Sequence, residues 1–166
     1  GHLIGIDTTT NRVLWSYKDF FAQSISYDNE SAYILYRKLV SYKNEVKNTE
    51  GVAKIDAATG RVIWTINYFS GMFNPDHNSA NIRISFDRDK VYFVSAKRLV
   101  CLKSSSGEIL SEISFNEPLR YVVCKNGVAY IGTNDRIFAY NFEQKNVVFT
   151  FQVNGENAYG YLKSEK

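Results

Sequence analysis

The sequence predicts an all-β fold made of repeated antiparallel units. The main observation is a phrase of two apolar stretches joined by a tight turn, which recurs at residues 4–15, 53–64, 100–111 and 138–149. The spacings between successive copies are 49, 47 and 38 residues. Aromatic residues make up 15% of the chain and there are only 2 prolines, a composition that suits strands. Repeats of roughly 40–45 residues with four strands each are typical of propellers. We therefore expect a small β-propeller of about four blades.

Each copy of the phrase predicts a hairpin of two strands. The copy AKIDAATGRVIW alternates apolar residues on both sides of its turn, as strands with a buried face do. Gly60 can take the positive φ that a tight turn requires, and Asn11 and Gly107 occupy the same place in their copies. Asp7 and Asp56 precede the turns, where a carboxylate accepts hydrogen bonds from the turn's own N–H groups. We interpret these residues as structural.

Two further strand-like stretches precede each later copy of the phrase. They flank polar turns, of which Asn126-Gly127 is the clearest two-residue hairpin turn. The three pairs align so that one tyrosine falls at the same place in each. The pairs cover residues 23–37, 82–96 and 121–133, and the tyrosines are Tyr33, Tyr92 and Tyr130. This predicts two strands in the first unit and four in each of the three later ones, 14 in all.

We expect the whole chain, residues 1–166, to form one domain. A strand from the tail 157–166 would pair with the N-terminal strands and close the ring, which removes exposed sheet edges. The alternatives are a segment of a larger propeller and two half-rings that meet as a homodimer. Gly1-His2 resembles a vector remnant. The expected blades are 3–17 with 157–166, then 22–68, 81–115 and 119–153.

The segment IDAATGRVIW carries a family resemblance. It is similar to the repeat of pyrroloquinoline-quinone-type β-propellers, whose units carry a tryptophan-docking motif of the form ALD-x-x-TG-x-x-x-W. The first two copies of the phrase match closely. The third keeps Ser106-Gly107 without the Asp and Trp, and the fourth keeps the pattern and Phe149. The resemblance implies that Trp15 and Trp64 pack between adjacent blades.

The resemblance does not imply that this chain binds the quinone cofactor. The quinone enzymes of the family need a larger ring, calcium ligands and, typically, a pair of adjacent cysteines that form a disulfide. This chain has 2 cysteines, Cys101 and Cys124, which are far apart in the sequence. We expect both to be buried free thiols, with a disulfide between them as the alternative. We predict no cofactor, no metal site and no catalytic residue, because no metal-binding spacing, phosphate loop or nucleophile motif is present.

The charge disfavours one class of partner, and the hydropathy gives no sign of a membrane span. The formal net charge is +3, and there is no RNA-binding signature, which disfavours a nucleic-acid partner. No apolar run approaches the roughly 20 residues of a membrane span, and no signal peptide is visible. We expect a cytoplasmic protein if the N-terminus is native, whereas a cut fragment leaves the compartment open.

Two long insertions predict where a partner binds. Strands that reverse at every turn place the second-to-third links and the unit-to-unit links on one face, and residues 38–51 and 67–80 both fall there as long loops. The first is rich in lysine and the second in aromatic residues, which suits a protein-binding surface. The alternative is that the aromatic residues fold inward as core. The candidate partner-binding residues are Tyr42, Lys43, Lys47, Tyr68, Phe69, Met72, Phe73 and His77.

The sequence therefore predicts a non-enzymatic protein-binding module. The specific hypothesis is a small immunity-type protein that binds and blocks a cognate toxin. The alternatives are a fragment of a larger propeller, either a scaffold of the outer-membrane assembly type or a sensor domain, and third a fragment of a quinone-dependent enzyme.

Overall fold

The computed structural model describes residues 3–18, 21–42, 45–68 and 83–152, with the side chains of 38–42, 45–49 and 68 excepted. These residues form 14 strands in four antiparallel sheets. Sheet 1 contains β1 (Leu3–Asp7) and β2 (Arg12–Tyr17). Sheet 2 contains β3 (Phe21–Tyr27), β4 (Ser31–Tyr42), β5 (Glu45–Asp56) and β6 (Val62–Tyr68). Sheet 3 contains β7 (Ile84–Asp87), β8 (Lys90–Ser95), β9 (Arg98–Lys103) and β10 (Ile109–Ser114). Sheet 4 contains β11 (Tyr121–Lys125), β12 (Val128–Gly132), β13 (Arg136–Asn141) and β14 (Asn146–Gln152).

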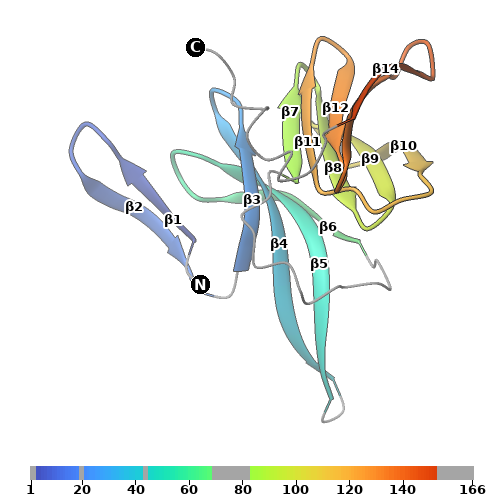
Figure 1. Ribbon diagram of the computed structural model, residues 1–166. Helices are drawn as coiled ribbons and strands as arrows, with labels where there is room; N and C mark the ends of the chain where they lie inside the picture. Colours follow the sequence, from blue (N-terminus) through green and yellow to red (C-terminus); the bar gives the residue numbers. More distant parts are fainter. Residues whose placement is uncertain (1–2, 19–20, 43–44, 69–82, 153–166) are drawn as a thin grey trace.

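The sheets follow one another in chain order, and each packs on the next. The β1–β2 hairpin lies at one end of the row and β14 at the other (Figure 1). Serine side chains on the first strand of one sheet connect it to the first strand of the next. The Cys124 N–H donates to Ser85 Oγ at 2.9 Å, and the Phe86 N–H donates to Ser26 Oγ at 2.9 Å. The all-β class built of four-stranded units, predicted from the sequence, is confirmed.

The hydrophobic core is divided among the three junctions between sheets. At the first junction Leu3 packs on Ala53 and Ile55, with Trp15 and Tyr17 at its edge. The second junction is larger, and its core comprises Tyr33, Leu35, Val52, Ile84, Val91, Phe93, Val100 and Leu102. The third junction's core comprises Tyr92, Val94, Leu99, Cys101, Leu119, Val122, Cys124, Ala129, Ile131 and Phe138. Stability is therefore spread along the row, as in repeat proteins whose units contact their neighbours.

The aspartates before the turns act as the sequence predicted. Asp56 Oδ1 accepts hydrogen bonds from the Thr59 and Ala58 N–H groups at 2.8 and 3.1 Å. Asp7 accepts in the same way from Thr9 and Thr10. The backbone hydrogen bond from Thr59 is the main cause of the lowered pKa of Asp56. Asn141 makes the equivalent contacts in the fourth copy, accepting from Glu143 and Gln144. The fourth copy therefore keeps these turn contacts although asparagine replaces the aspartate.

The prediction of a long loop over 38–51 is wrong. Strand β4 runs to Tyr42 and β5 begins at Glu45, so this segment is an extension of the β4–β5 hairpin with its link at 43–44. The extended hairpin projects beyond the other strands (Figure 1). Its register is continuous from Ser31↔Asp56 to Tyr42↔Glu45. Backbone pairing needs no apolar face, and β-branched residues such as Val40, Val46 and Thr49 favour strands even among lysines.

Both cysteines are free and buried. Burial raises the pKa of the Cys101 thiol to about 11 and raises that of Cys124 well above its ordinary value. The expectation of buried free thiols is therefore met, and the thiols contribute to the core of the third junction.

Candidate functional site

Each of the first two junctions is fastened by a tryptophan. Trp15 on β2 donates a hydrogen bond from Nε1 to the carbonyl of Ala57 at 2.9 Å, and Trp64 on β6 donates from Nε1 to the carbonyl of Ser104 at 2.9 Å. Ala57 and Ser104 are the first turn residues of their copies of the phrase. The two tryptophans therefore lie at equivalent places on the next sheet, and the inter-blade role implied by the resemblance is what the structure shows.

The turn residue beneath each tryptophan is a glycine. A Cβ on Gly60 would lie 2.4 Å from Trp15 Cγ, and one on Gly107 would lie 2.8 Å from Trp64 Cε3. Both glycines have positive φ, 74° and 76°. The first and fourth copies carry Asn11 and a lysine at this place, also with positive φ. Glycine is thus found where a tryptophan covers the turn, because the ring leaves no room for a Cβ.

The third junction lacks this fastening. Ser111 of β10 stands where Trp15 and Trp64 stand in the earlier copies, and the turn of sheet 4 that it faces carries Lys145 in place of glycine. The outer strand β14 is exposed at all 7 of its positions. In the described part of the chain, no tryptophan therefore docks from the outer strand of sheet 3 on sheet 4.

A groove lies at this third junction, between the end of β10 and the strands β13 and β14. It has a volume of about 230 Å³. Phe115, Phe138 and Val147 form apolar walls, and Glu117, Arg136 and Thr150 supply polar groups. The Phe115 and Phe138 rings pack in a tilted arrangement with centroids 5.1 Å apart.

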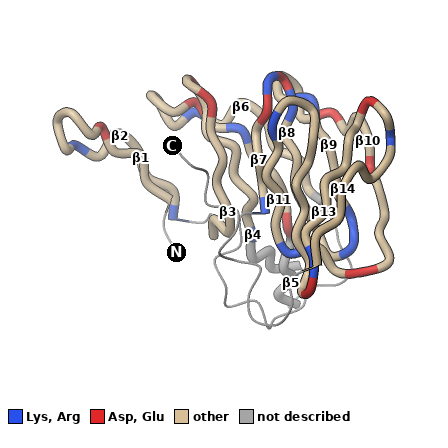
Figure 2. Tube along the Cα trace, turned by 45° about the horizontal axis from the view of Figure 1, so that its top comes forward, with Lys and Arg blue, Asp and Glu red and all other residues tan. Residues whose placement is uncertain are grey.

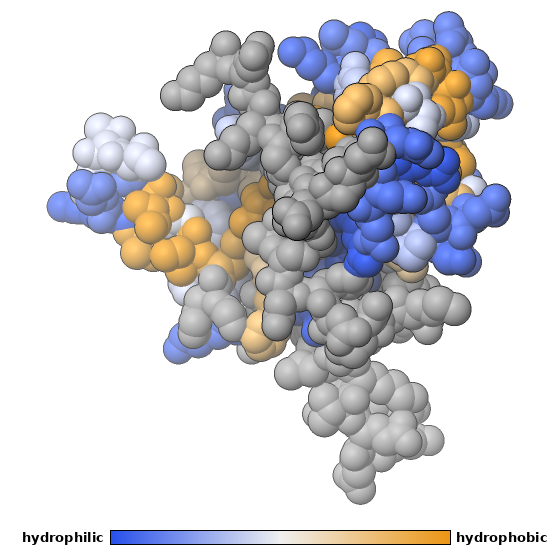
Figure 3. All heavy atoms as spheres, in the orientation of Figure 1, coloured by the Kyte–Doolittle hydropathy of each residue, from blue (hydrophilic) through white to orange (hydrophobic). Residues whose placement is uncertain are grey.

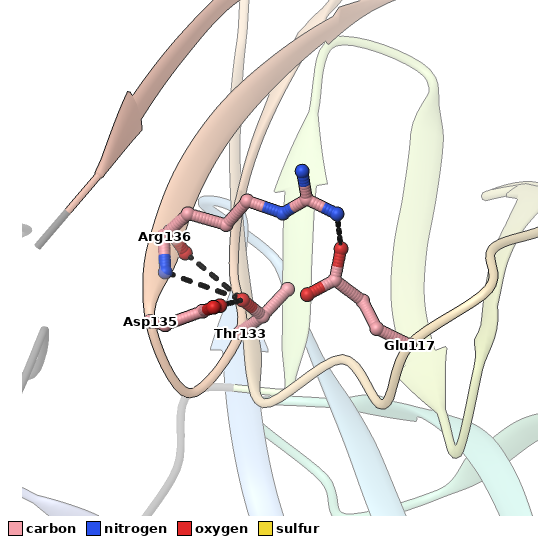
Figure 4. Close-up of polar contacts among 4 residues, drawn as sticks. All are labelled: Glu117, Thr133, Asp135 and Arg136. Carbon is pink, nitrogen blue, oxygen red and sulfur yellow. Dashed lines mark hydrogen bonds and ion pairs between the residues drawn. The ribbon is translucent and has the colours of Figure 1, made fainter.

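An ion pair closes one end of the groove. The guanidinium of Arg136 pairs with the carboxylate of Glu117 through Nη2 and Oε1 (Figure 4). The turn before Arg136 is fixed by Thr133, whose hydroxyl donates to Asp135 Oδ1 at 3.0 Å and accepts from the Arg136 N–H at 3.3 Å. Because Glu117 already neutralises Arg136, the groove has no excess charge at this end. Its chemistry suits an apolar or amphipathic side chain better than a free anion.

A second polar cluster joins sheets 2 and 3 but is buried. Arg83 Nη1 donates to Gln23 Oε1 at 3.1 Å, and Nη2 donates to the carbonyl of Val94 at 3.2 Å. Burial lowers the pKa of Arg83, and the carboxylate of Glu50, 4.0 Å away, opposes that shift. Both side chains are largely inaccessible, so we interpret the cluster as a structural bridge.

The eight predicted partner-binding residues cannot be compared with this groove directly. Lys43, Phe69, Met72, Phe73 and His77 lie outside the described residues, and only the backbones of Tyr42, Lys47 and Tyr68 are described. The groove does lie on the expected face, since Glu117 belongs to a unit-to-unit link and Arg136 follows a second-to-third link.

The groove residues were not among those predicted from the sequence. The signal that could have located this junction is Ser111 in the tryptophan position of the third copy. Charged residues give little guidance, because they gather at turns and strand ends over much of the row (Figure 2). Among the residues that the structure describes, no cluster of histidine, cysteine, aspartate or glutamate could hold a metal ion. Over the same residues, no helix is long and apolar enough to cross a membrane.

A comparison with protein families shows to which family the chain belongs. The model of the family described as outer membrane protein assembly factor BamB matches residues 1–151. The chain belongs to this BamB family. The predicted pyrroloquinoline-quinone-type repeat is thereby confirmed. No curated protein sequence matches the chain.

Solved structures support the same fold. BamB from Moraxella catarrhalis matches with a TM-score of 0.64 and 18% identity, over 92% of this chain and 43% of that chain. Sqt1 from Saccharomyces cerevisiae matches with a TM-score of 0.57 and 12% identity, over 90% and 42%. A europium-containing methanol dehydrogenase matches with a TM-score of 0.55 and 11% identity, over 87% and 27%. The chain thus spans less than half the length of each of these proteins, and at these identities the likeness establishes the fold alone.

Proposed function

We propose that this BamB-type domain is a protein-binding module and that the groove at the third junction receives an apolar side chain of the partner. The observation that carries the proposal is the groove itself, with its walls of Phe115, Phe138 and Val147 and its neutral Glu117–Arg136 end. Aromatic walls with a polar rim are the usual composition of an interface hot spot. A binding role fits this chemistry, because Glu117 already neutralises the charge of Arg136. The Nε of Arg136 is buried and has no hydrogen-bond partner among the described residues.

The groove is open to a partner along its outer side. Val147 and Thr150 of β14 are exposed, whereas Phe138 behind them is buried. A partner side chain would therefore contact an aromatic floor without displacing core residues. We expect binding to depend on the fit of one or two anchor side chains, as at other interfaces with a small hot spot.

Filling the groove tests this proposal. We would select peptides from a random displayed library on the immobilised chain and measure the dissociation constant of the best peptide. Thr150→Trp places a large ring over the groove and should weaken binding at least about tenfold, the equivalent of roughly 1.4 kcal/mol. Thr65→Trp is the matched control, because Thr65 is also exposed and lies at the same repeat position on β6. It should leave the dissociation constant unchanged.

A specific binding result would contradict the proposal. If the selected peptides bind the Thr150→Trp variant as tightly as the original chain, the binding surface lies elsewhere. Urea unfolding of both variants shows whether each substitution has preserved the fold, so that lost binding is not confused with lost structure.

A narrower version of the proposal is an immunity-type protein that blocks a toxin in the cytoplasm. It is supported by a binding groove whose apolar walls suit a protein side chain. A scaffold role of the outer-membrane assembly type is supported by the family match over residues 1–151. The gene context distinguishes them, since an adjacent toxin gene whose product binds the groove is expected only for the immunity role.

A further inference from the structure

The hairpin turn between β11 and β12 carries a chemically reactive dipeptide. Asn126 and Gly127 occupy the two turn positions, between the paired residues Lys125 and Val128. Both turn residues have positive φ, 53° and 78°, and Asn126 is exposed. In an Asn-Gly pair the backbone nitrogen of the glycine can attack the side-chain amide of the asparagine, because glycine has no side chain to obstruct the approach. Nothing lies within 4 Å of a Cβ added at Gly127, so the surroundings leave this approach open as well.

The neighbouring sheet holds the nitrogen that would attack. The Gly127 N–H donates to Asp87 Oδ2 at 2.8 Å, and Asp87 is the last residue of β7 in sheet 3. The Gly127 carbonyl accepts from the Phe142 N–H at 3.3 Å. Both backbone groups of Gly127 are therefore bonded, one across the third junction and one within sheet 4. The turn lies at the upper end of sheet 4 in Figure 1. The groove lies at the opposite end, since Glu117 precedes β11 whereas Asn126 follows it.

The hydrogen bond from Gly127 to Asp87 opposes attack on the Asn126 amide. Attack requires the Gly127 nitrogen to lose its proton and to turn toward the Asn126 side chain. The Asp87 carboxylate accepts a hydrogen bond through that proton, and its negative charge disfavours a second negative charge on the nitrogen. A two-residue turn bonded on both sides also resists the backbone rotation that ring closure needs. The closed junction therefore slows a reaction that the turn sequence favours.

We propose that Asn126 is a deamidation site that Asp87 protects while the third junction is closed. When the junction opens locally, the Gly127 nitrogen forms a bond to Asn126 Cγ, the Cγ–Nδ2 bond breaks, and ammonia leaves with the proton of the Gly127 nitrogen. Water then opens the cyclic imide at either carbonyl, which gives aspartate or isoaspartate. Water is the only co-reactant. Hydrophilic surface lies beside apolar surface at the upper end of sheet 4 (Figure 3), so water reaches the turn.

The product changes the junction permanently. Aspartate and isoaspartate both place a new negative charge near the Asp87 carboxylate, which repels it. Isoaspartate also inserts the Cβ of residue 126 into the main chain, so the turn between Lys125 and Val128 becomes longer than a two-residue hairpin turn. Closing the junction again does not restore the amide. Deamidated chains therefore accumulate with the time that the third junction has spent open.

Peptide mapping by mass spectrometry measures the reaction at position 126. Samples of the folded chain at neutral pH would be digested over several days, and the deamidated fraction of this peptide would be followed. Asp87→Ala should raise the deamidation rate at least about tenfold, the factor expected when a hydrogen bond to a charged acceptor is lost. Asp87→Asn keeps an oxygen that can accept from Gly127, so its rate should lie nearer that of the original chain.

Asp89→Ala is the matched control for charge. Asp89 is exposed in the β7–β8 turn, and its hydrogen bond from the Ser104 N–H uses the backbone carbonyl, which alanine retains. This variant should deamidate at the rate of the original chain. Urea unfolding of each variant shows whether the fold is preserved. A second Asn-Gly pair, Asn154-Gly155, lies outside the described residues and serves as the reference in guanidinium chloride, where the two sites should react at similar rates.

Two outcomes overturn the proposal. One is a folded original chain that deamidates at Asn126 as rapidly as it does in guanidinium chloride. The other is an Asp87→Ala variant that stays folded and reacts no faster than the Asp89→Ala control. The first comparison needs no variant, so it remains decisive should Asp87→Ala unfold. Peptide binding to the groove enters neither measurement, so failure here is distinguishable from failure of the proposed function.

Discussion

Replacing Gly60 by alanine is a direct test of how the sheets are fastened together. Gly60 has a φ of 74°, and an added Cβ would lie 2.4 Å from Trp15 Cγ and 2.7 Å from Trp15 Cβ. Gly127 provides the matched control, since its φ is 78° and nothing lies within 4 Å of its added Cβ. Gly127→Ala therefore carries the backbone cost alone, whereas Gly60→Ala also displaces the docked tryptophan.

The expected losses of stability follow from the backbone cost and from the displacement of Trp15. A residue with a Cβ in the left-handed region costs about 1–2 kcal/mol, which is the whole effect expected for Gly127→Ala. Displacing Trp15 adds the loss of its hydrogen bond to Ala57, about 1 kcal/mol, and part of the roughly 3–5 kcal/mol that truncation of a buried tryptophan costs. Trp15 is only half-buried. We therefore expect Gly60→Ala to lower the free energy of unfolding by about 3–5 kcal/mol in total.

Urea unfolding followed by circular dichroism, at one fixed protein concentration, measures both variants. A double-mutant cycle with Trp15→Ala then isolates the contact, because alanine at position 60 should cost only the backbone contribution once the ring is gone. The expected coupling energy is about 2 kcal/mol. Equal destabilisation by Gly60→Ala and Gly127→Ala, or a coupling energy near zero, would refute the docking argument.

Three further predictions concern stability, pH and thiol reactivity. Trp64→Ala should lower the free energy of unfolding by about 2–4 kcal/mol while leaving peptide binding to the groove intact; a variant of unchanged stability that loses binding would contradict this. Asp28→Asn should destabilise the fold by about 1–2 kcal/mol at pH 7, because Asp28 accepts hydrogen bonds from the Glu30 and Ser31 N–H groups and from the Tyr33 hydroxyl at 2.7 Å. Burial opposes ionisation of Asp28, but these hydrogen bonds prevail, so its pKa lies below the ordinary 3.8. The stabilisation by the ionised carboxylate is complete above that value and is lost as the pH falls through the folded pKa. The urea midpoints of the two proteins should therefore converge below about pH 4. Because burial raises the pKa of Cys101 to about 11, a thiol reagent at pH 8 should label the folded chain slowly and both cysteines rapidly in urea, whereas rapid labelling of the folded chain would contradict the burial.

The repeat made most of the fold predictable. The copies of the phrase locate hairpins, and the aspartates, glycines and tryptophans within them do what those residue types do in tight turns and inter-blade contacts. The extended β4–β5 hairpin was not predicted, because residues 38–51 lack the apolar alternation that identifies a half-buried strand. Cross-strand hydrogen bonds determine that element, and a polar strand pair shows no such periodicity.

The candidate site was less predictable than the fold. Phe115 lies far from Arg136 and Phe138 in the sequence and is brought to them only by the packing of sheet 3 on sheet 4. Long loops were expected to form the binding surface, whereas the groove is lined by residues of β10, β13, β14 and the link between β10 and β11. The pattern of the repeat was visible, but the consequence of breaking it depends on three-dimensional neighbours.

Site-specific photocrosslinking tests the central claim most directly, namely that the domain binds a protein partner through the groove at its third junction. The photoreactive residue p-benzoylphenylalanine would replace Thr150 beside the groove, Thr65 at the same position of sheet 2, or Phe73 in the segment that the sequence favoured. In cells that naturally produce the chain, we predict a discrete crosslinked partner from position 150 and none from position 65. A partner captured only from position 73, or equally from positions 65 and 150, would contradict the account.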